Sequence, residues 1–147
     1  MKIKVKVVPE LENIEVEIQC PKITPEVNDI ERILSLNILT LQGKKDQRMY
    51  TLAPRDIYYF DALDHDVFAY TKDDIYEVNY KLYQLEDMLK DVFLRINKNT
   101  LVNPKMIKSF QSSINGRMEA ELINKDRLVI SRMYVKDLKA MLRGEKR

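Results

Sequence analysis

Apolar and polar residues alternate near the start of the chain. Isoleucine and valine occupy every second position over residues 2–8, with lysines between them, and over residues 14–18, with glutamates between them. This period of two predicts two strands, and a hairpin made from them would pair opposite charges. Thr24-Pro25-Glu26 then has the order of a helix start: a hydroxyl cap, a proline and an acidic residue. Apolar residues at helical spacing continue to about residue 37, and a strand is expected over residues 38–42.

Short apolar runs separated by polar turns fill most of the chain from residue 48 onward. Runs of this length are typical of an antiparallel sheet. We expect strands over residues 48–52, 57–60, 67–70, 75–78, 93–96, 100–102, 106–110, 118–123 and 127–130. Asn115-Gly116 is a strong hairpin signal between two of them.

Two further segments have the spacing of amphipathic helices. The first should form about three turns within residues 80–91, with an apolar face of Leu82, Leu85, Met88 and Leu89. The second ends the chain, where Ser131 is placed to cap it, with an apolar face of Tyr134, Leu138, Met141 and Leu142. Together these elements predict an α+β fold, mostly antiparallel β, with two or three short helices. Residues 1–47 would form a strand–strand–helix–strand extension to it.

Composition narrows the class of protein. No apolar run approaches the roughly 18 residues that a membrane-spanning helix needs. Cys20 is the only cysteine, which excludes an intrachain disulfide and a cysteine-based metal cage. Both features predict a cytoplasmic protein.

The charge is unevenly distributed along the chain. The overall formal charge is only +2. Residues 54–91 hold 4 basic and 10 acidic side chains, whereas residues 92–147 hold 13 basic and 5 acidic ones. The basic C-terminal part has the electrostatic footprint of a phosphate-binding surface. We expect the acidic block to face away from that surface, on turns and on the helix within residues 80–91.

The sequence offers little catalytic chemistry. His65 is the only histidine, so a two-histidine metal site is excluded, and Asp64-His65-Asp66 has the pattern of a turn between strands rather than of an acid–base or metal site. Three glycines are too few for a glycine-rich phosphate loop, and there is no GxSxG nucleophile motif. We therefore expect neither an enzyme nor a bound cofactor or metal.

Three blocks of sequence match a known signature in order. Residues 93–103, FLRINKNTLVN, resemble the signature of LytTR DNA-binding domains, approximately F-x-R-x-H-[RK]-S-x-x-V-N. The matching positions are Phe93, Arg95, Lys98, Val102 and Asn103. Residues 57–60 and 68–71 resemble an earlier block of the family, and residues 131–134 resemble its C-terminal S-R-x-Y. The resemblance covers roughly residues 48–143.

The resemblance implies a fold and a function for residues 48–147. LytTR-like domains are elongated, mostly β structures that place loops, rather than a recognition helix, in successive major grooves. About 50 residues precede the match, too few for a phosphoacceptor domain, so the resemblance implies a stand-alone transcriptional regulator. Its partner would be double-stranded DNA with paired direct-repeat sites, bound by two protomers. The extension over residues 1–47 would serve dimerisation or the sensing of a partner.

The resemblance places three loops at DNA. In the first, His65 is the expected contact because the carboxylate of Asp66 would repel phosphate, but a plain turn remains an open alternative. In the second, Lys98 would contact phosphate or guanine and Asn99 would contact adenine. Asn97 is also expected among the DNA contacts of this loop. Asn97 and Asn99 replace the usual histidine and serine of the family, which puts the base preference in doubt.

The third loop precedes the C-terminal helix. Arg132 matches the family's S-R pair, with a structural ion pair as the open alternative. Met133 stands where many members place a second contact, and its side chain offers only an apolar surface, for example to a thymine methyl group. Lys105 and Lys108 follow the second loop and would add phosphate contacts, whereas Arg95 lies in a strand and is expected to be structural.

The main alternative belongs to another functional class. It is a protein-interaction module of LytTR-like fold that binds a membrane protein or a related regulator. The polar, basic segment Asn97-Lys98-Asn99 favours DNA over this alternative.

Overall fold

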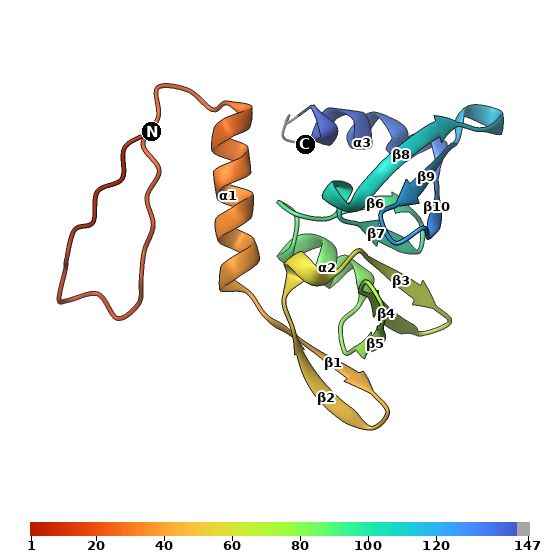
Figure 1. The fold of residues 1–147 in the computed structure, drawn as a ribbon, viewed down its shortest axis with the longest axis horizontal. Helices are drawn as coiled ribbons and strands as arrows, with labels where there is room; N and C mark the ends of the chain where they lie inside the picture. The colour runs from red at the N-terminus through yellow and green to blue at the C-terminus, as the bar shows by residue number, and fades with distance from the viewer. Residues whose placement is uncertain (144–147) are drawn as a thin grey trace.

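The computed structural model describes residues 1–143, apart from the side chains of residues 36–38. This part of the chain forms two antiparallel sheets, one of seven strands in the order β2-β1-β5-β4-β3-β7-β6 and one of three strands in the order β10-β9-β8. Figure 1 shows the three-stranded sheet with α3 above the seven-stranded sheet, and α1 to one side of both. The predicted α+β class with mostly antiparallel strands is confirmed.

The element bounds follow the order of the chain. The seven-stranded sheet contains β1 (Leu41–Lys45), β2 (Arg48–Leu52), β3 (Tyr59–Leu63), β4 (Asp66–Tyr70), β5 (Ile75–Val78), β6 (Leu94–Asn97) and β7 (Thr100–Val102). The three-stranded sheet contains β8 (Ile107–Ser112), β9 (Met118–Leu122) and β10 (Arg127–Ile130). The α-helices are α1 (Pro25–Ile38), α2 (Leu82–Met88) and α3 (Val135–Leu142), and single 3-10 turns are η1 (Pro54–Asp56), η2 (Pro104–Met106), η3 (Ile114–Gly116) and η4 (Arg132–Tyr134).

The seven-stranded sheet is covered on both faces. Side chains of β3 alternate between two apolar clusters: Phe60 packs with Phe93 and α2 on one side, and Tyr59 packs with the three-stranded sheet and α3 on the other. The rings of Phe60 and Phe93 lie 5.0 Å apart, and the rings of Tyr59 and Tyr70 stack at 4.3 Å. Burial on both faces fixes the strand register, because a slip of one residue would move each side chain to the opposite face and into the wrong apolar cluster.

The N-terminal prediction is half right. Thr24 caps α1, its hydroxyl accepting a hydrogen bond from the Val27 amide at 3.4 Å, and Pro25 occupies the first helical turn. The strands predicted over residues 2–8 and 14–18 are wrong, because no strand forms before α1. A lone two-stranded hairpin is marginal in water, and here nothing in the described chain covers its apolar face. Figure 1 shows this segment as an open loop on the far side of α1.

Several predicted boundaries also change. The strand after α1 begins at Leu41 rather than at residue 38, and its pairing with β5 makes it part of the main sheet although it precedes residue 48. The helix predicted over about three turns is the seven-residue α2. Ser131 does not cap α3, because η4 intervenes and Tyr134 precedes the helix instead.

Two features are absent from the described residues. None of their helices combines the length and the apolar character needed to span a membrane. No cluster of three or more histidine, cysteine, aspartate or glutamate side chains that could hold a metal ion occurs within residues 1–143.

Candidate nucleic-acid interface

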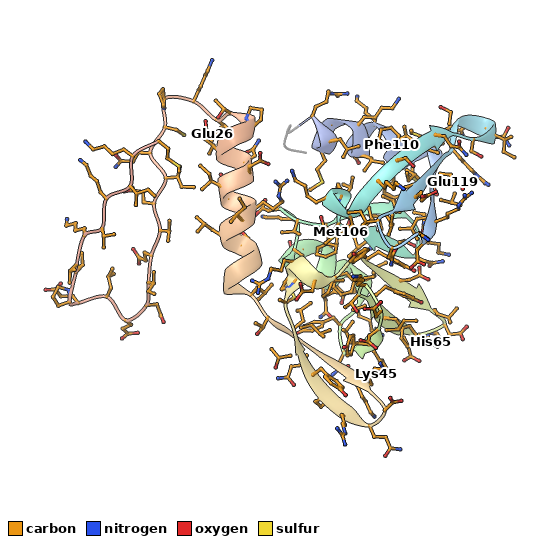
Figure 2. The ribbon with its side chains drawn as sticks, in the orientation of Figure 1. Glu26, Lys45, His65, Met106, Phe110 and Glu119 are labelled. Atoms are coloured by element: carbon orange, nitrogen blue, oxygen red, sulfur yellow. The ribbon has the colours of Figure 1, made fainter. Side chains whose placement is uncertain are left out.

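The β3–β4 turn carries the first predicted contact. Leu63 pairs with Asp66 across the turn, and Asp64 takes the left-handed conformation, with φ of 57°, that a two-residue turn requires. His65 is exposed at the tip (Figure 2). Asp64 and Asp66 are exposed beside it, so the acidity predicted to oppose DNA at this loop is present.

The β6–β7 turn carries the second set of contacts. Asn97 organises it: its Oδ1 accepts a hydrogen bond from the Asn99 amide at 2.9 Å, and its Nδ2 donates to the Val129 carbonyl at 2.8 Å. Both polar ends of the Asn97 side chain are therefore engaged within the protein. Lys98 and Asn99 are exposed at the tip.

Arg95 holds the same turn from the other side. Its guanidinium donates to the Lys98 carbonyl at 2.7 Å and pairs with Glu86 of α2 at 3.1 Å. The Arg95 side chain is only 16% exposed. This arrangement fits the structural role predicted for Arg95, because the guanidinium fixes the Lys98 backbone and leaves the Lys98 side chain in solvent.

The first two turns lie at the same edge of the sheet. β3 and β7 pair antiparallel with Asp61 opposite Thr100, so the end of β3 lies beside the start of β7. The Ala62 amide donates to the Asn99 carbonyl at 2.8 Å, and the Thr100 hydroxyl donates to Asp61 at 2.8 Å. These bonds tie the β3–β4 turn to the β6–β7 turn.

The third predicted segment is η4, which joins the same edge through β6. The Ser131 amide donates to the Ile96 carbonyl at 2.8 Å, so η4 begins beside the end of β6. Arg132 and Met133 follow and are exposed, and the Met133 side chain is 77% exposed. Its large apolar surface in solvent is consistent with the apolar contact that the sequence predicts.

The β8–β9 turn is a fourth loop at this edge, and none of the sequence motifs marks it as part of the site. Gly116 has φ of 76°, and a Cβ atom placed on it would lie 2.8 Å from Cδ of Arg132. The aliphatic stem of Arg132 therefore packs on this turn. Arg117 is exposed next to it. A basic residue beside the Asn-Gly signal, in the basic part of the chain, was the clue available in the sequence.

We refer to these four segments, residues 64–65, 98–99, 113–117 and 132–134, as the four-loop edge. In Figure 1 the β3–β4 and β8–β9 turns both project on the side opposite α1. Lys98, Arg117 and Arg132 are its permanent cations, and none of them forms an ion pair within residues 1–143. Such side chains donate to phosphate oxygens and to the O6 and N7 atoms of guanine.

Lys105 lies elsewhere. It belongs to η2, which follows the opposite end of β7, and its Nζ lies 3.9 Å from Asp29 of α1. Lys105, α1 and α2 border a groove of about 830 Å³ that also contains Glu86 and Asp87. The structure thus separates Lys105 from the other predicted contacts. Glu86 and Asp87 of α2 border this groove, and Glu86 also pairs with Arg95, which holds the β6–β7 turn.

Tyr59 links the two sheets behind the edge. Its hydroxyl donates to Asp126 of the β9–β10 turn at 3.0 Å. Burial and this hydrogen bond to a carboxylate raise the pKa of Tyr59 well above its ordinary value. Burial also raises the pKa of Tyr70, which stacks on Tyr59. The pair therefore stays neutral and holds the three-stranded sheet in place.

Comparisons with known proteins agree with this architecture. A solved structure, the LytTr DNA-binding domain of a putative methyl-accepting/DNA response regulator from Bacillus cereus, superimposes with a TM-score of 0.66 at 20% identity, covering 70% of this chain and 95% of that one. Two relatives from Staphylococcus aureus, in strains bovine RF122 / ET3-1 and NCTC 8325 / PS 47, are named as uncharacterized HTH-type transcriptional regulators. Each is 29% identical over 131 residues, 86% of this chain and 88% of the relative.

The names of these relatives refer to a helix-turn-helix, but the described part of this chain has a different arrangement. Its three α-helices are separated from one another by strands, so no two consecutive α-helices are joined by a short turn. The family model for the LytTr DNA-binding domain matches residues 47–143, more than half of the chain and all four loops of the edge. The chain therefore belongs to the LytTr DNA-binding domain family.

Proposed function

We propose that this protein is a transcriptional regulator that binds double-stranded DNA through the four-loop edge. One observation carries the proposal: antiparallel pairing and short hydrogen bonds gather four polar loops, with Lys98, Arg117 and Arg132, at one edge of the molecule. Membership of a DNA-binding family supports the same partner, and the S. aureus relatives are named as transcriptional regulators.

The loops have different chemical roles in this proposal. Lys98 and Asn99 project from a turn whose backbone is held by hydrogen bonds, so Asn99 is suited to read a base edge in the major groove and Lys98 to neutralise phosphate beside it. Arg117 and Arg132 contact phosphates and set the register of the protein on the duplex. His65 and Met133 extend the footprint at its two ends, and Asn97 positions the reading turn without contacting DNA.

The assembly on DNA is the next part of the proposal. Two protomers occupy paired direct-repeat sites as a homodimer in the cytoplasm. A protein-interaction module that binds a membrane protein would not need exposed cations on three adjoining loops, so DNA is the better-supported partner.

The proposal is tested by fluorescence anisotropy with DNA from upstream of the protein's own gene and with a shuffled duplex, at several salt concentrations. Replacing Lys98, Arg117 and Arg132 together with alanine should abolish specific binding. A matched control replaces Lys44, Lys72 and Lys125, exposed lysines away from the edge, and should retain the preference for the upstream sequence. Equal losses in both triple variants would contradict the proposed interface.

A further inference from the structure

The N-terminal arm, residues 2–18, has a sequence suited to strands but no strand structure. We call residues 2–8 its basic limb and residues 14–18 its acidic limb. Both limbs are extended, and the one backbone hydrogen bond within the arm, from Leu11 to Val8, closes the bend between them. No backbone hydrogen bond joins the two limbs in the described structure. Figure 1 shows them as the two sides of an open loop that lies apart from both sheets.

The limbs leave an unusual amount of apolar surface in solvent. The side chains of Ile3, Val5 and Val7 are 80%, 89% and 84% exposed, and those of Ile14 and Val16 are 94% and 59% exposed. Each limb also leaves its backbone amides and carbonyls without strand partners. Unpaired strand edges next to an apolar face favour pairing with another chain.

Pairing the two limbs within one chain would satisfy their backbone groups but would leave their apolar face exposed to solvent. An isolated two-stranded hairpin is marginal in water and becomes stable when further strands or a covering layer bury one of its faces. The body of the same molecule does not supply that layer, because the arm lies beyond α1 from both sheets (Figure 1). The covering layer must therefore come from another molecule.

The charges of the two limbs identify that molecule. Lys2, Lys4 and Lys6 give the basic limb three positive charges, and Glu15 and Glu17 give the acidic limb two negative ones. Opposite charges facing each other across paired strands are favourable and like charges are unfavourable. A second copy of this chain brings one limb of each sign, so a two-fold arrangement satisfies both limbs of both copies.

We propose that two copies dimerise through their arms, the basic limb of each copy pairing with the acidic limb of the other. The resulting intermolecular sheet uses the backbone groups of all four limbs and brings their apolar faces together. This dimer forms without DNA, so it does not depend on the function proposed for the four-loop edge. Since α1 connects each arm to its body, the arms join two DNA-binding bodies through a part of the chain that the edge does not use.

Reversing the charges of one limb in the full chain tests whether the limbs pair between two copies. One variant carries Lys2→Glu, Lys4→Glu and Lys6→Glu, and a second carries Glu15→Lys and Glu17→Lys. Sedimentation velocity should find the unmodified protein dimeric and each variant dissociating at least about tenfold more readily, because its limbs now have the same sign. Mixing the two variants should restore dimers, and native mass spectrometry should identify them as mixed pairs.

Mixing the two variants distinguishes limbs that pair between chains from limbs that form a hairpin within one chain. A hairpin closed within each chain stays repulsive in both variants, so mixing would restore nothing. The control matched to the Glu15/Glu17 variant is Glu10→Lys with Glu12→Lys, which makes the same charge change as that variant in the bend between the limbs and should stay dimeric. A monomeric unmodified protein, reversed variants that dimerise normally, or a mixture without mixed pairs would each overturn the proposal.

Discussion

Lys98 is exposed while its backbone is fixed. The Lys98 carbonyl accepts a hydrogen bond from Arg95 at 2.7 Å, and Asn97 holds the following amide. A charge presented from a fixed turn contacts DNA with little loss of backbone entropy. We therefore treat Lys98 as a direct contact and Asn97 and Arg95 as the residues that position it.

Lys98→Ala should weaken DNA binding and lower the steepness of its salt dependence by about one charge. Lys105→Ala is the informative comparison, because Lys105 lies next to Asp29 at the other end of β7 and should change neither quantity. Anisotropy titrations over a range of salt concentrations measure both. If the Lys105 variant loses the salt dependence and the Lys98 variant keeps it, the assignment of the edge is wrong.

Asn97→Ala should act differently, because Asn97 bonds to the protein itself. Loss of its hydrogen bonds to Val129 and Asn99 should lower the free energy of unfolding by about 1 kcal/mol. DNA affinity should fall with an unchanged salt slope, since the charge of Lys98 remains. Urea unfolding and anisotropy measure the stability and the DNA affinity, and a normal stability with a reduced affinity would mean that Asn97 contacts DNA directly.

The residues of the site were only partly predictable. The motif match drew attention to residues 97–99 and to Arg132, which the structure brings to one edge. It did not reveal that the side-chain amide of Asn97 donates a hydrogen bond to the Val129 carbonyl, 32 positions away. That contact depends on how β10 packs next to β6. For the same reason the motif match did not show that Arg117 lies next to the turn on which Arg132 packs, or that Lys105 lies apart from the other predicted contacts. Adjacency to a motif in sequence does not give adjacency in a folded sheet.

The contact between β3 and the β9–β10 turn links the two sheets. It consists of the buried Tyr59 side chain and its hydrogen bond to Asp126. The folded-state pKa of Tyr59 lies above the value of 10.0 for a free tyrosine. The hydrogen bond of the Tyr59 hydroxyl therefore contributes fully to stability at pH values below about 10. Its contribution is lost as the pH rises through the folded-state pKa.

Tyr59→Phe should consequently alter the alkaline behaviour of the protein. At neutral pH the variant should be less stable by about 1 kcal/mol, because the hydrogen bond to Asp126 is lost. Above about pH 10 the unmodified protein should lose stability more steeply than the variant, and the two curves should converge. Chemical denaturation at a series of pH values measures this, and parallel curves across the alkaline range would contradict the assignment.

Elements were predicted well where burial and local signals agree. The strands Arg48–Leu52, Ile75–Val78 and Arg127–Ile130 have the predicted bounds, and Thr24 starts α1 as expected. Alternation alone misled the prediction in the N-terminal arm, because a period of two shows that a segment suits a strand without showing what it pairs with. Ser131 failed as a cap because a 3-10 turn, which has no separate sequence signal here, precedes α3.

The whole molecule separates its charges. The permanent cations of the edge lie on loops, whereas Glu86 and Asp87 border the groove next to α1. Asp64 and Asp66 are exceptions, because they lie exposed beside His65 at the edge. The first loop is therefore the least favourable part of the edge for phosphate.

This separation predicts the overall salt dependence of DNA binding. With Lys98, Arg117 and Arg132 as the phosphate-neutralising cations of one protomer, log K should fall against log salt with a slope of about −3 per bound protomer. A slope with a magnitude below about one would mean that the cations of the edge do not contact phosphate. A slope above about six per protomer would require contacts from a second surface.

Amide chemical-shift mapping of the full chain with its upstream DNA shows which residues DNA contacts. If DNA meets the four-loop edge, the largest shifts should fall at residues 64–66, 97–99, 113–117 and 131–133, with small changes in α1, in α2 and at Lys105. Shifts concentrated along α1 and α2, with the four loops unchanged, would contradict this interface.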